Sequence, residues 1–242
     1  ELRAFAASAK KRGIRDVVLL GMGGSSLGPE VFRTTFGSSR GYPRLWVLDS
    51  TVPGWVQQVT REIDPARSLF ILASKSGGTI EVMSLFAHFW ELVHQTPGHQ
   101  GGAQFVAITD PGTGLEKLAA EHQFWRTFTN PPDIGGRYSV LSYFGLVPAA
   151  LMGIDISRLL TRAMTMAEAC RIPSPPERNP GADLGAVMGS LAQAGRNKIT
   201  LITSPQIAAF GLWAEQILAE STRKGGTGII PVAHEQLVKP TA

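Results

Sequence analysis

One stretch of the sequence decides the fold: Leu69-Phe70-Ile71-Leu72-Ala73-Ser74-Lys75-Ser76-Gly77-Gly78-Thr79-Ile80-Glu81. It opens with five apolar residues in a row, which is typical of a strand covered on both faces in a parallel sheet. A polar turn with two glycines follows, and a helical pattern begins at Ile80 and runs to Gln95. We therefore expect a strand, a tight turn and a helix in direct succession.

The turn at 74–79 has the chemistry of an anion site. It supplies three hydroxyls, two glycines and one lysine: Ser74, Ser76, Thr79, Gly77, Gly78 and Lys75. The glycines let the backbone approach a ligand closely, and Thr79 is a favourable N-cap for a helix that would aim its free amides at the turn. Phosphate is the anion that such a turn suits best. The alternative is ordinary connection chemistry between a strand and a helix.

The composition is that of a globular α/β chain. The sequence has 242 residues, of which 43% are hydrophobic and 17% charged, and it contains 27 glycines. This excludes a disordered or coiled-coil chain and allows one large domain or two small ones. The net charge of +4 suits a small anionic substrate. The basic cluster Lys10-Lys11-Arg12 is interpreted as a solvated helix face, so we expect no nucleic acid partner.

The cysteine content and the hydropathy favour a cytoplasmic protein. The one cysteine, Cys170, excludes a disulfide framework and a cysteine-based metal site. No apolar run reaches the ~20 residues that a membrane helix needs, and residues 1–7 do not form a signal peptide. We therefore expect neither a membrane partner nor a metal. The chain begins without Met and inside a helical pattern, so we expect a piece of a longer protein.

A second strand–turn–helix junction lies earlier in the chain. The apolar strand 16–20 runs into Gly21-Met22-Gly23-Gly24-Ser25-Ser26-Leu27-Gly28-Pro29. A dinucleotide fingerprint, Gly-x-Gly-x-x-Gly, needs a third glycine where Ser26 stands. Asp49 nevertheless lies ~20 residues on, where a ribose-binding acid belongs. A nicotinamide-dependent oxidoreductase therefore stays open as an alternative.

Strands and helices alternate along residues 1–155. The expected strands are 16–20, 45–48, 69–73, 104–108 and 124–128, and the expected helices include 1–12, 54–62, 80–95, 115–122 and 142–152. This alternation predicts a parallel sheet with helices on both faces. Ligands bind at the carboxyl ends of such strands, which is where both glycine turns fall.

The later part of the chain predicts a second, smaller lobe. Before it, Gly135-Gly136-Arg137 either exposes a guanidinium on a free backbone or is a loop with a surface arginine. A proline-rich run at 172–180 is interpreted as the connection between two lobes. The elements expected after it are a helix at 182–194, strands at 198–203 and 228–232, and a long helix opened by Pro205. These are too few to complete a sheet like the first, so we expect domains at 1–155 and 181–242, joined by 156–180.

Four stretches together resemble the phosphoglucose isomerase family, within the sugar-isomerase (SIS) fold. They are 21–29, 74–79, Gly135-Gly136-Arg137-Tyr138-Ser139-Val140 and Gln216-Ile217-Leu218-Ala219-Glu220-Ser221-Thr222. They occur in the family's order and span nearly the whole chain. The first stretch and residues 220–230 resemble most the isomerase half of transaldolase/phosphoglucose isomerase fusion proteins. The resemblance implies an SIS-type parallel sheet flanked by helices, followed by an incomplete second SIS-like lobe, and it implies a homodimer.

The resemblance also implies the residues that bind a phosphorylated sugar. These are Gly24, Ser25, Ser74, Lys75, Ser76, Thr79 and Gln216. The hydroxyls of the turn at 74–79 would hold the phosphate, while Gly24 and Ser25 would line the sugar site. Gln216 would sit beside the substrate.

Two further residues would carry the chemistry, the interconversion of glucose 6-phosphate and fructose 6-phosphate without a cofactor. Glu220 would be the base that moves a proton between C1 and C2, and Arg137 would stabilise the enediol intermediate. Glu220 and Gln216 are four residues apart on one predicted helix and so share a face. Without the other stretches, Glu220 would be interpreted as a solvated helix carboxylate.

The sequence departs from the family near its end. The family opens the sugar ring with a histidine downstream of the catalytic glutamate and uses a lysine near its C-terminus. His234 lies too close to Glu220 to be that histidine, and Lys239 has no recognisable context. We therefore expect the ring-opening acid to lie beyond this chain and the fragment to be weak or inactive. A non-catalytic sugar-phosphate-binding module, in which Glu220 is incidental, is the other alternative.

Overall fold

Five parallel strands form the sheet of the first part of the chain, in the order β2-β1-β3-β4-β5. The structure is a computed structural model that describes residues 1–171 and 179–235. The strands are β1 (Asp16–Gly21), β2 (Arg44–Leu48), β3 (Ser68–Ala73), β4 (Phe105–Thr109) and β5 (Arg126–Thr129). All neighbouring pairs run parallel. β1, β3 and β4 are buried along their whole length, as their apolar runs predict.

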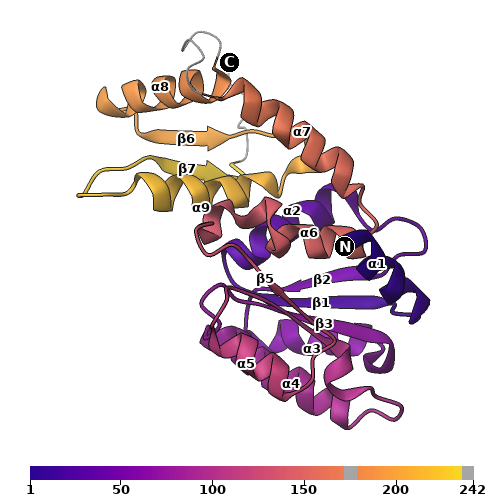
Figure 1. Cartoon of the computed structure of the whole chain (residues 1–242). Helices are drawn as coiled ribbons and strands as arrows, with labels where there is room; N and C mark the ends of the chain where they lie inside the picture. The colour runs from indigo at the N-terminus through magenta and orange to yellow at the C-terminus, as the bar shows by residue number, and fades with distance from the viewer. Residues whose placement is uncertain (172–178, 236–242) are drawn as a thin grey trace, which may run out of the picture. The chain divides into compact units, whose positions relative to one another are not determined.

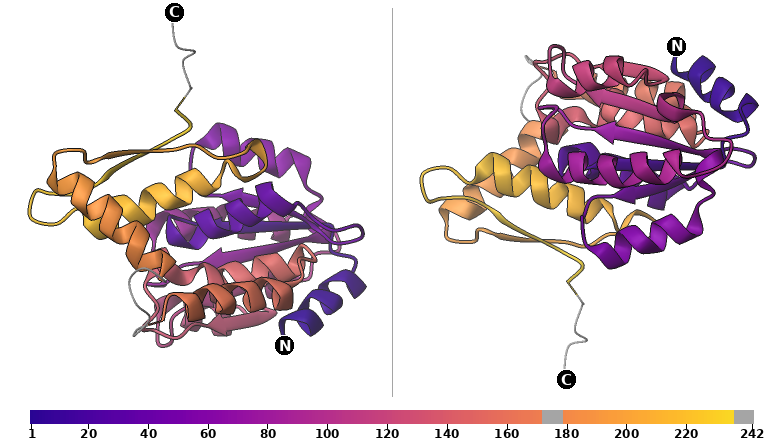
Figure 2. Two further views of the ribbon diagram at one scale, coloured as in Figure 1. Left: turned by 90° about the horizontal axis from the view of Figure 1, so that it is seen from above. Right: turned by 90° about the horizontal axis from the view of Figure 1, so that it is seen from below.

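Helices cover both faces of this sheet (Figure 1 and Figure 2). One face carries α3 (Pro53–Glu62), α4 (Ile80–His94) and α5 (Gly114–Glu121), and the other carries α1 (Leu2–Lys11), α2 (Gly24–Phe36) and α6 (Tyr143–Leu151). Successive strand residues point to opposite faces, so Val18, Leu20 and Phe70 join α3, α4 and α5 in one apolar cluster. The predicted α/β class, a parallel sheet flanked by helices, is confirmed.

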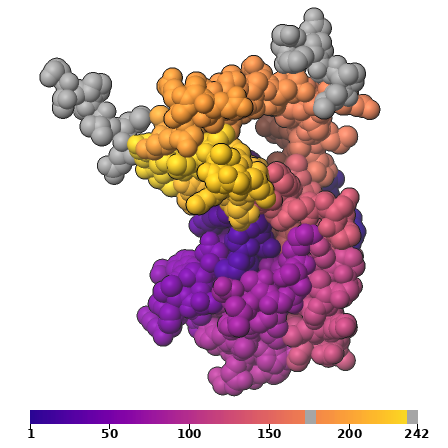
Figure 3. Space-filling view, turned by 90° about the vertical axis from the view of Figure 1, so that its left-hand side faces the viewer, coloured from indigo at the N-terminus to yellow at the C-terminus, as the bar shows by residue number. Residues whose placement is uncertain are grey.

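The chain divides into two compact units, Glu1–Ile154 and Asp155–Ala242. Figure 3 draws them as atoms, with the later elements of the second unit in orange and yellow. The second unit contains α7 (Ile156–Ala169), α8 (Pro180–Gln193), β6 (Lys198–Leu201), α9 (Phe210–Thr222) and β7 (Ile230–Ala233). β6 and β7 pair in parallel. Most of the proline-rich run, residues 172–178, lies outside the described residues, as does Lys239.

The second unit buries little apolar surface. No residue of α8 is fully buried, and Leu184, Val187 and Leu191 on that helix are 60%, 51% and 40% exposed. In α9 the fully buried residues are the small Gly211 and Ala214. A two-stranded sheet with so small a core is marginally stable by itself. An incomplete second lobe would have such exposed apolar faces.

Several predicted boundaries are wrong, three of them for clear local reasons. The strand expected at 124 begins at Arg126, because Gln123 adopts a φ of 53° and turns the chain. The strand expected to reach residue 203 ends at Leu201, and Ile202 is 64% exposed. The helix expected from Pro205 begins at Phe210, because Pro205–Ile207 forms a separate 3-10 turn.

Candidate active site

The two glycine-containing turns leave neighbouring strands at one edge of the sheet. β1 pairs with β3, and Gly21 at the end of β1 is in register with Ala73 at the end of β3. β2 lies on one side of β1 and β3 on the other, so the strand order reverses between β1 and β3. Such a reversal opens a crevice outside the carboxyl ends of the two strands, where α/β proteins bind ligands. The expectation that both turns fall at this edge is confirmed.

The turn after β3 is held in shape by hydrogen bonds and by a neighbouring connection. The Ser74 amide donates to the Ile108 carbonyl of β4 at 3.0 Å, and the Gly77 amide donates to Ser74 Oγ at 3.1 Å. Gly77 has a φ of +69°, and a Cβ built on it would lie 2.4 Å from Cβ of Thr113. Glycine is therefore required here by the backbone conformation and by the close approach of the next connection.

The hydroxyls of this turn fall into two groups. Ser74 Oγ and Thr79 Oγ1 lie 2.8 Å apart and bond to each other, whereas Ser76 is exposed. Thr79 is the N-cap of α4, as expected, but its side chain makes no capping hydrogen bond. The first amides of α4 have no acceptor within their own helix. With the cap side chain turned to Ser74 instead, these amides are left for an anion.

Lys75 is already paired. Its ammonium group forms an ion pair with Asp110, which follows β4, and donates to the Pro132 carbonyl at 3.0 Å. The Asp110 amide donates to the Lys75 carbonyl at 3.4 Å. Asp110 follows β4 directly, and an acid in that position signals a side chain at the ligand-binding edge of a parallel sheet. The turn thus carries less net positive charge than its sequence suggests.

The turn after β1 packs against the segment that carries Arg137, a 3-10 helix labelled η3 (Gly136–Leu141). A Cβ built on Gly24 would lie 2.2 Å from the Gly136 carbonyl oxygen. Ser139 Oγ donates to that same oxygen at 2.7 Å. The structure therefore brings Gly24 and the start of the Arg137 segment into direct contact, with the adjacent Ser25 only 8% exposed.

This packing bears on the dinucleotide alternative. A pyrophosphate would approach the start of the helix after the first strand. Here that helix is α2, and the main chain of Gly136 occupies the space beside Gly24 that a pyrophosphate would need. Asp49 follows β2; partial desolvation raises its pKa, the nearby Glu30 carboxylate raises it further, and its own backbone hydrogen bond opposes the rise. The turn at 21–29 therefore packs against the Arg137 segment.

In the second unit, Gln216 and Glu220 lie one turn apart on α9. Gln216 Nε2 donates to Glu220 Oε1 at 3.2 Å, so their predicted shared face is confirmed. Glu220 is exposed. Gln216 Oε1 is buried and has no hydrogen-bond partner in the part of the chain that the structure describes. The Gln216 amide thus orients the carboxylate and keeps an acceptor for a further hydroxyl or water.

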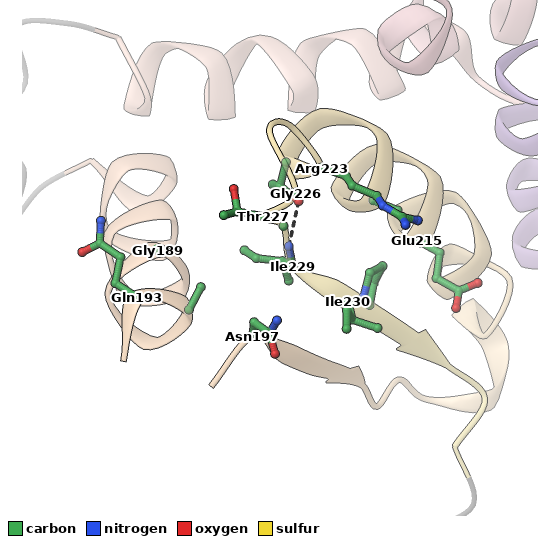
Figure 4. Close-up of a pocket in the computed structure, with 14 residues that line it drawn as sticks. Gly189, Gln193, Asn197, Glu215, Arg223, Gly226, Thr227, Ile229 and Ile230 are labelled. Carbon is green, nitrogen blue, oxygen red and sulfur yellow. Dashed lines mark hydrogen bonds between the residues drawn. The ribbon is translucent and has the colours of Figure 1, made fainter. Parts of the chain in front are cut away.

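A cavity of about 1040 Å³ lies elsewhere in the second unit, between the end of α8 and the connection from α9 to β7 (Figure 4). Gln193 and Asn197 border it from one side and Ile229 from the other. The Ile229 amide donates to Thr222 Oγ1 at 3.0 Å. Glu215 borders the cavity too, and its Oε1 accepts from the Ala233 amide at 3.2 Å. Glu215 therefore ties α9 to β7, and we interpret the cavity as a gap in the packing.

Among residues 1–171 and 179–235, no three His, Cys, Asp or Glu side chains are grouped to hold a metal ion. Within the same ranges, no helix combines the length and the apolar character that a bilayer span requires.

Known proteins resemble this chain over most of its length. The phosphoglucose isomerase family model matches residues 5–210. A glucose-6-phosphate isomerase of Carboxydothermus hydrogenoformans is 32% identical over 217 residues, covering 86% of this chain and 47% of the relative. One of Rubrobacter xylanophilus is 32% identical over 241 residues, covering 93% of this chain and 54% of the relative. The chain spans about half the length of these curated relatives.

Solved structures have the same fold. A glucose-6-phosphate isomerase from Chlamydia trachomatis matches with a TM-score of 0.82 and 25% identity, over 96% of this chain and 45% of that one. A putative phosphosugar isomerase from Bacillus subtilis shares the fold at a TM-score of 0.59 and 16% identity, over 90% of this chain and 62% of that one. On the match of the family model and the two curated relatives, this chain belongs to the phosphoglucose isomerase family.

Proposed function

We propose that this chain is the part of a glucose-6-phosphate isomerase that holds the substrate and the catalytic base. The observation that carries the proposal is the pairing of two turns at the β1/β3 switch point. One turn suits a phosphate, and the other is packed onto the segment of Arg137. A sugar phosphate needs such adjoining sites, because its phosphate anchors the sugar at a set distance from the reacting carbons. The named relatives are isomerases of this substrate.

The phosphate binds at the turn after β3. The exposed Ser76 hydroxyl and the first amides of α4 donate to its oxygens. Ser74 and Thr79, now bonded to each other, turn their hydroxyl protons to the ligand, which is inexpensive because a hydroxyl rotates freely. Lys75 adds a charge that Asp110 partly offsets. The anion is therefore held mainly by hydrogen bonds from a preset backbone.

The chemistry is a proton transfer between adjacent carbons. Glu220 removes the proton on C2 of the open-chain aldose and returns it to C1, while a proton moves from O2 to O1. Arg137 stabilises the negative charge that develops on the enediolate oxygens, since a guanidinium stays protonated throughout. Gly24 and Ser25 line the sugar, and Gln216 holds the Glu220 carboxylate. The reaction is redox-neutral and needs no cofactor.

Further features of the whole protein follow from the same proposal. Ring opening needs an acid that we place outside this chain, so the isolated fragment is weakly active or inactive. The resemblance to the family supports a cytoplasmic homodimer for the whole protein, and the likeness of residues 21–29 and 220–230 to the fusion proteins supports a fused transaldolase domain. Sedimentation of the whole polypeptide tests the dimer, and the length of its open reading frame tests the fusion.

The Glu220→Gln substitution tests the assignment of the base. In the whole polypeptide we expect it to abolish both isomerisation and the exchange of solvent deuterium into fructose 6-phosphate, while sugar-phosphate binding persists. Glu215→Gln is the matched control: it lies on the same helix, and a glutamine oxygen still accepts the bond from Ala233. If Glu220→Gln retains activity, Glu220 is not the base. If the unmodified protein binds glucose 6-phosphate without exchange, the non-catalytic binding module is correct.

The nicotinamide alternative has its own test. Titration with NADH, followed by the fluorescence of the nicotinamide, should show no saturable binding, because the Gly136 backbone closes the approach to Gly24. Saturable binding that Asp49→Asn weakens would instead support the oxidoreductase.

A further inference from the structure

A second connection reaches into the anion-binding turn from the neighbouring strand. The residues after β4 approach it at two points: Asp110 holds Lys75, and Thr113 packs against Gly77. Thr113 also forms the N-cap of α5 and lies 2.8 Å, hydroxyl to hydroxyl, from Thr109. The turn that binds the phosphate is therefore braced from outside, by residues to which the proposed function gives no role.

Asp110 contacts Lys75 through both its backbone and its side chain. The Asp110 carboxylate pairs with the Lys75 ammonium, and the Asp110 amide donates to the Lys75 carbonyl at 3.4 Å. The Pro132 carbonyl completes the arrangement by accepting from the ammonium at 3.0 Å. A lysine side chain has many rotamers and loses entropy when it is ordered. Much of this side-chain entropy is already lost before a ligand binds.

The pair is also too enclosed to be an incidental surface contact. The side chains of Lys75 and Asp110 are 32% and 15% exposed. The second carboxylate oxygen, Oδ1, is buried and has no hydrogen-bond partner within the described residues. Burying such an acceptor is unfavourable, and an ion pair of this kind contributes little to stability compared with apolar packing. The main effect of this carboxylate is therefore on the position of Lys75 and not on stability.

We propose that Asp110 is a positioning residue of the phosphate site, which presets Lys75 and the backbone of the turn for the anion. The inference rests on the proposed function, because it assigns the turn to a sugar phosphate. Asp110 does not touch the ligand. It acts through Lys75, so its effect on binding disappears when Lys75 no longer carries a charge.

A double-mutant cycle tests this dependence. We would titrate the whole polypeptide, unmodified and as Asp110→Asn, Lys75→Met and the double variant, with glucose 6-phosphate and, separately, with inorganic phosphate by calorimetry. Asp110→Asn keeps the size of the side chain and the main-chain bond. We expect it to weaken both ligands by about three- to tenfold, and to change binding less than about twofold in the Lys75→Met background. Glu121→Gln, an exposed site in the same unit, is the charge-matched control and should bind normally.

The possible outcomes separate the two proposals. If Asp110→Asn binds as tightly as the unmodified chain or more tightly, Asp110 only opposes the anion and the positioning role is refuted. The role is also refuted if the loss persists in full without the lysine charge, because Asp110 then acts on the fold alone. If the unmodified chain binds neither ligand, the phosphate site itself is wrong, and the proposed function falls together with this inference.

Discussion

Gly24→Ala is the substitution that most directly tests the contact between the turn after β1 and the segment that carries Arg137. The added Cβ would lie 2.2 Å from the Gly136 carbonyl oxygen, 2.5 Å from its carbon and 3.2 Å from the Arg137 amide. All three atoms belong to the backbone, so no side chain can rotate away. Either α2 or η3 has to move.

The expected change in the free energy of unfolding is the difference between two opposing contributions. Overpacking of this kind costs about 1–3 kcal/mol, and rigid backbone on both sides places this case near the upper end. Alanine regains at most about 1 kcal/mol of helix propensity at the first residue of α2. In a chain of this size, each 1 kcal/mol moves Tm by about 2–4 °C. We therefore expect Tm to fall by about 4–8 °C.

The assay is thermal unfolding followed by tryptophan fluorescence, which reports mainly the first unit because four of the five tryptophans lie there. These are Trp46, Trp55, Trp90 and Trp125. Gly54→Ala is the control, since it stands in the first turn of α3 with no atom within 4 Å of the added Cβ. It should leave Tm unchanged or raise it slightly.

Function should respond more than stability does. Because η3 carries Arg137, displacing it should lower kcat of the whole enzyme with a smaller effect on phosphate binding. A Gly24→Ala variant that is as stable and as active as the Gly54→Ala variant would refute the close approach, and with it the argument that this turn exists to hold the Arg137 segment.

Three further predictions follow from the same structure. Gly77→Ala, at a φ of +69° and against Thr113, should weaken inorganic phosphate binding at least tenfold (~1.4 kcal/mol). Gly78→Ala, whose added Cβ meets open space, should bind phosphate normally. Equal effects of the two substitutions in calorimetry would contradict the role of the Gly77–Thr113 contact. Because the pKa of Asp49 is raised in the folded chain, the folded state binds that proton more tightly than the unfolded chain does, and stability is lost as the pH rises through the raised pKa. Asp49→Asn should therefore raise Tm at pH 7, and the gain in Tm should shrink below about pH 4. A gain in Tm that does not depend on pH would contradict the raised pKa. In hydrogen exchange at neutral pH, the amides of β6 and β7 should exchange faster than those of β1, β3 and β4, since few apolar side chains of the second unit are buried. Equal protection of the two sets of amides would show that the exposed apolar faces of the second unit are covered in solution.

The shared face of Gln216 and Glu220 could be predicted from spacing, but its local contacts could not. A separation of four residues placed Gln216 and Glu220 on one face because a helix turns every 3.6 residues. Their hydrogen bond and the buried, unpaired oxygen of Gln216 depend on rotamers and neighbours. In the same way, a threonine before a helix predicts a cap, yet Thr79 bonds to Ser74 instead. A hydroxyl has several nearby partners, and only the folded chain selects among them.

The sequence by itself determined the elements and the class of the first unit, because unbroken apolar runs ending in glycine turns allow few structures other than buried parallel strands. Which turns would meet was decided by tertiary structure. The order β2-β1-β3-β4-β5 sets β1 beside β3, so the turns at 21–29 and 74–79 are neighbours at the edge that the sequence already predicted for both. The same packing brought Asp110 to Lys75 and Gly136 to Gly24 across separations of 35 and more residues. Such contacts follow from how helices and strands pack, and local sequence carries no record of them.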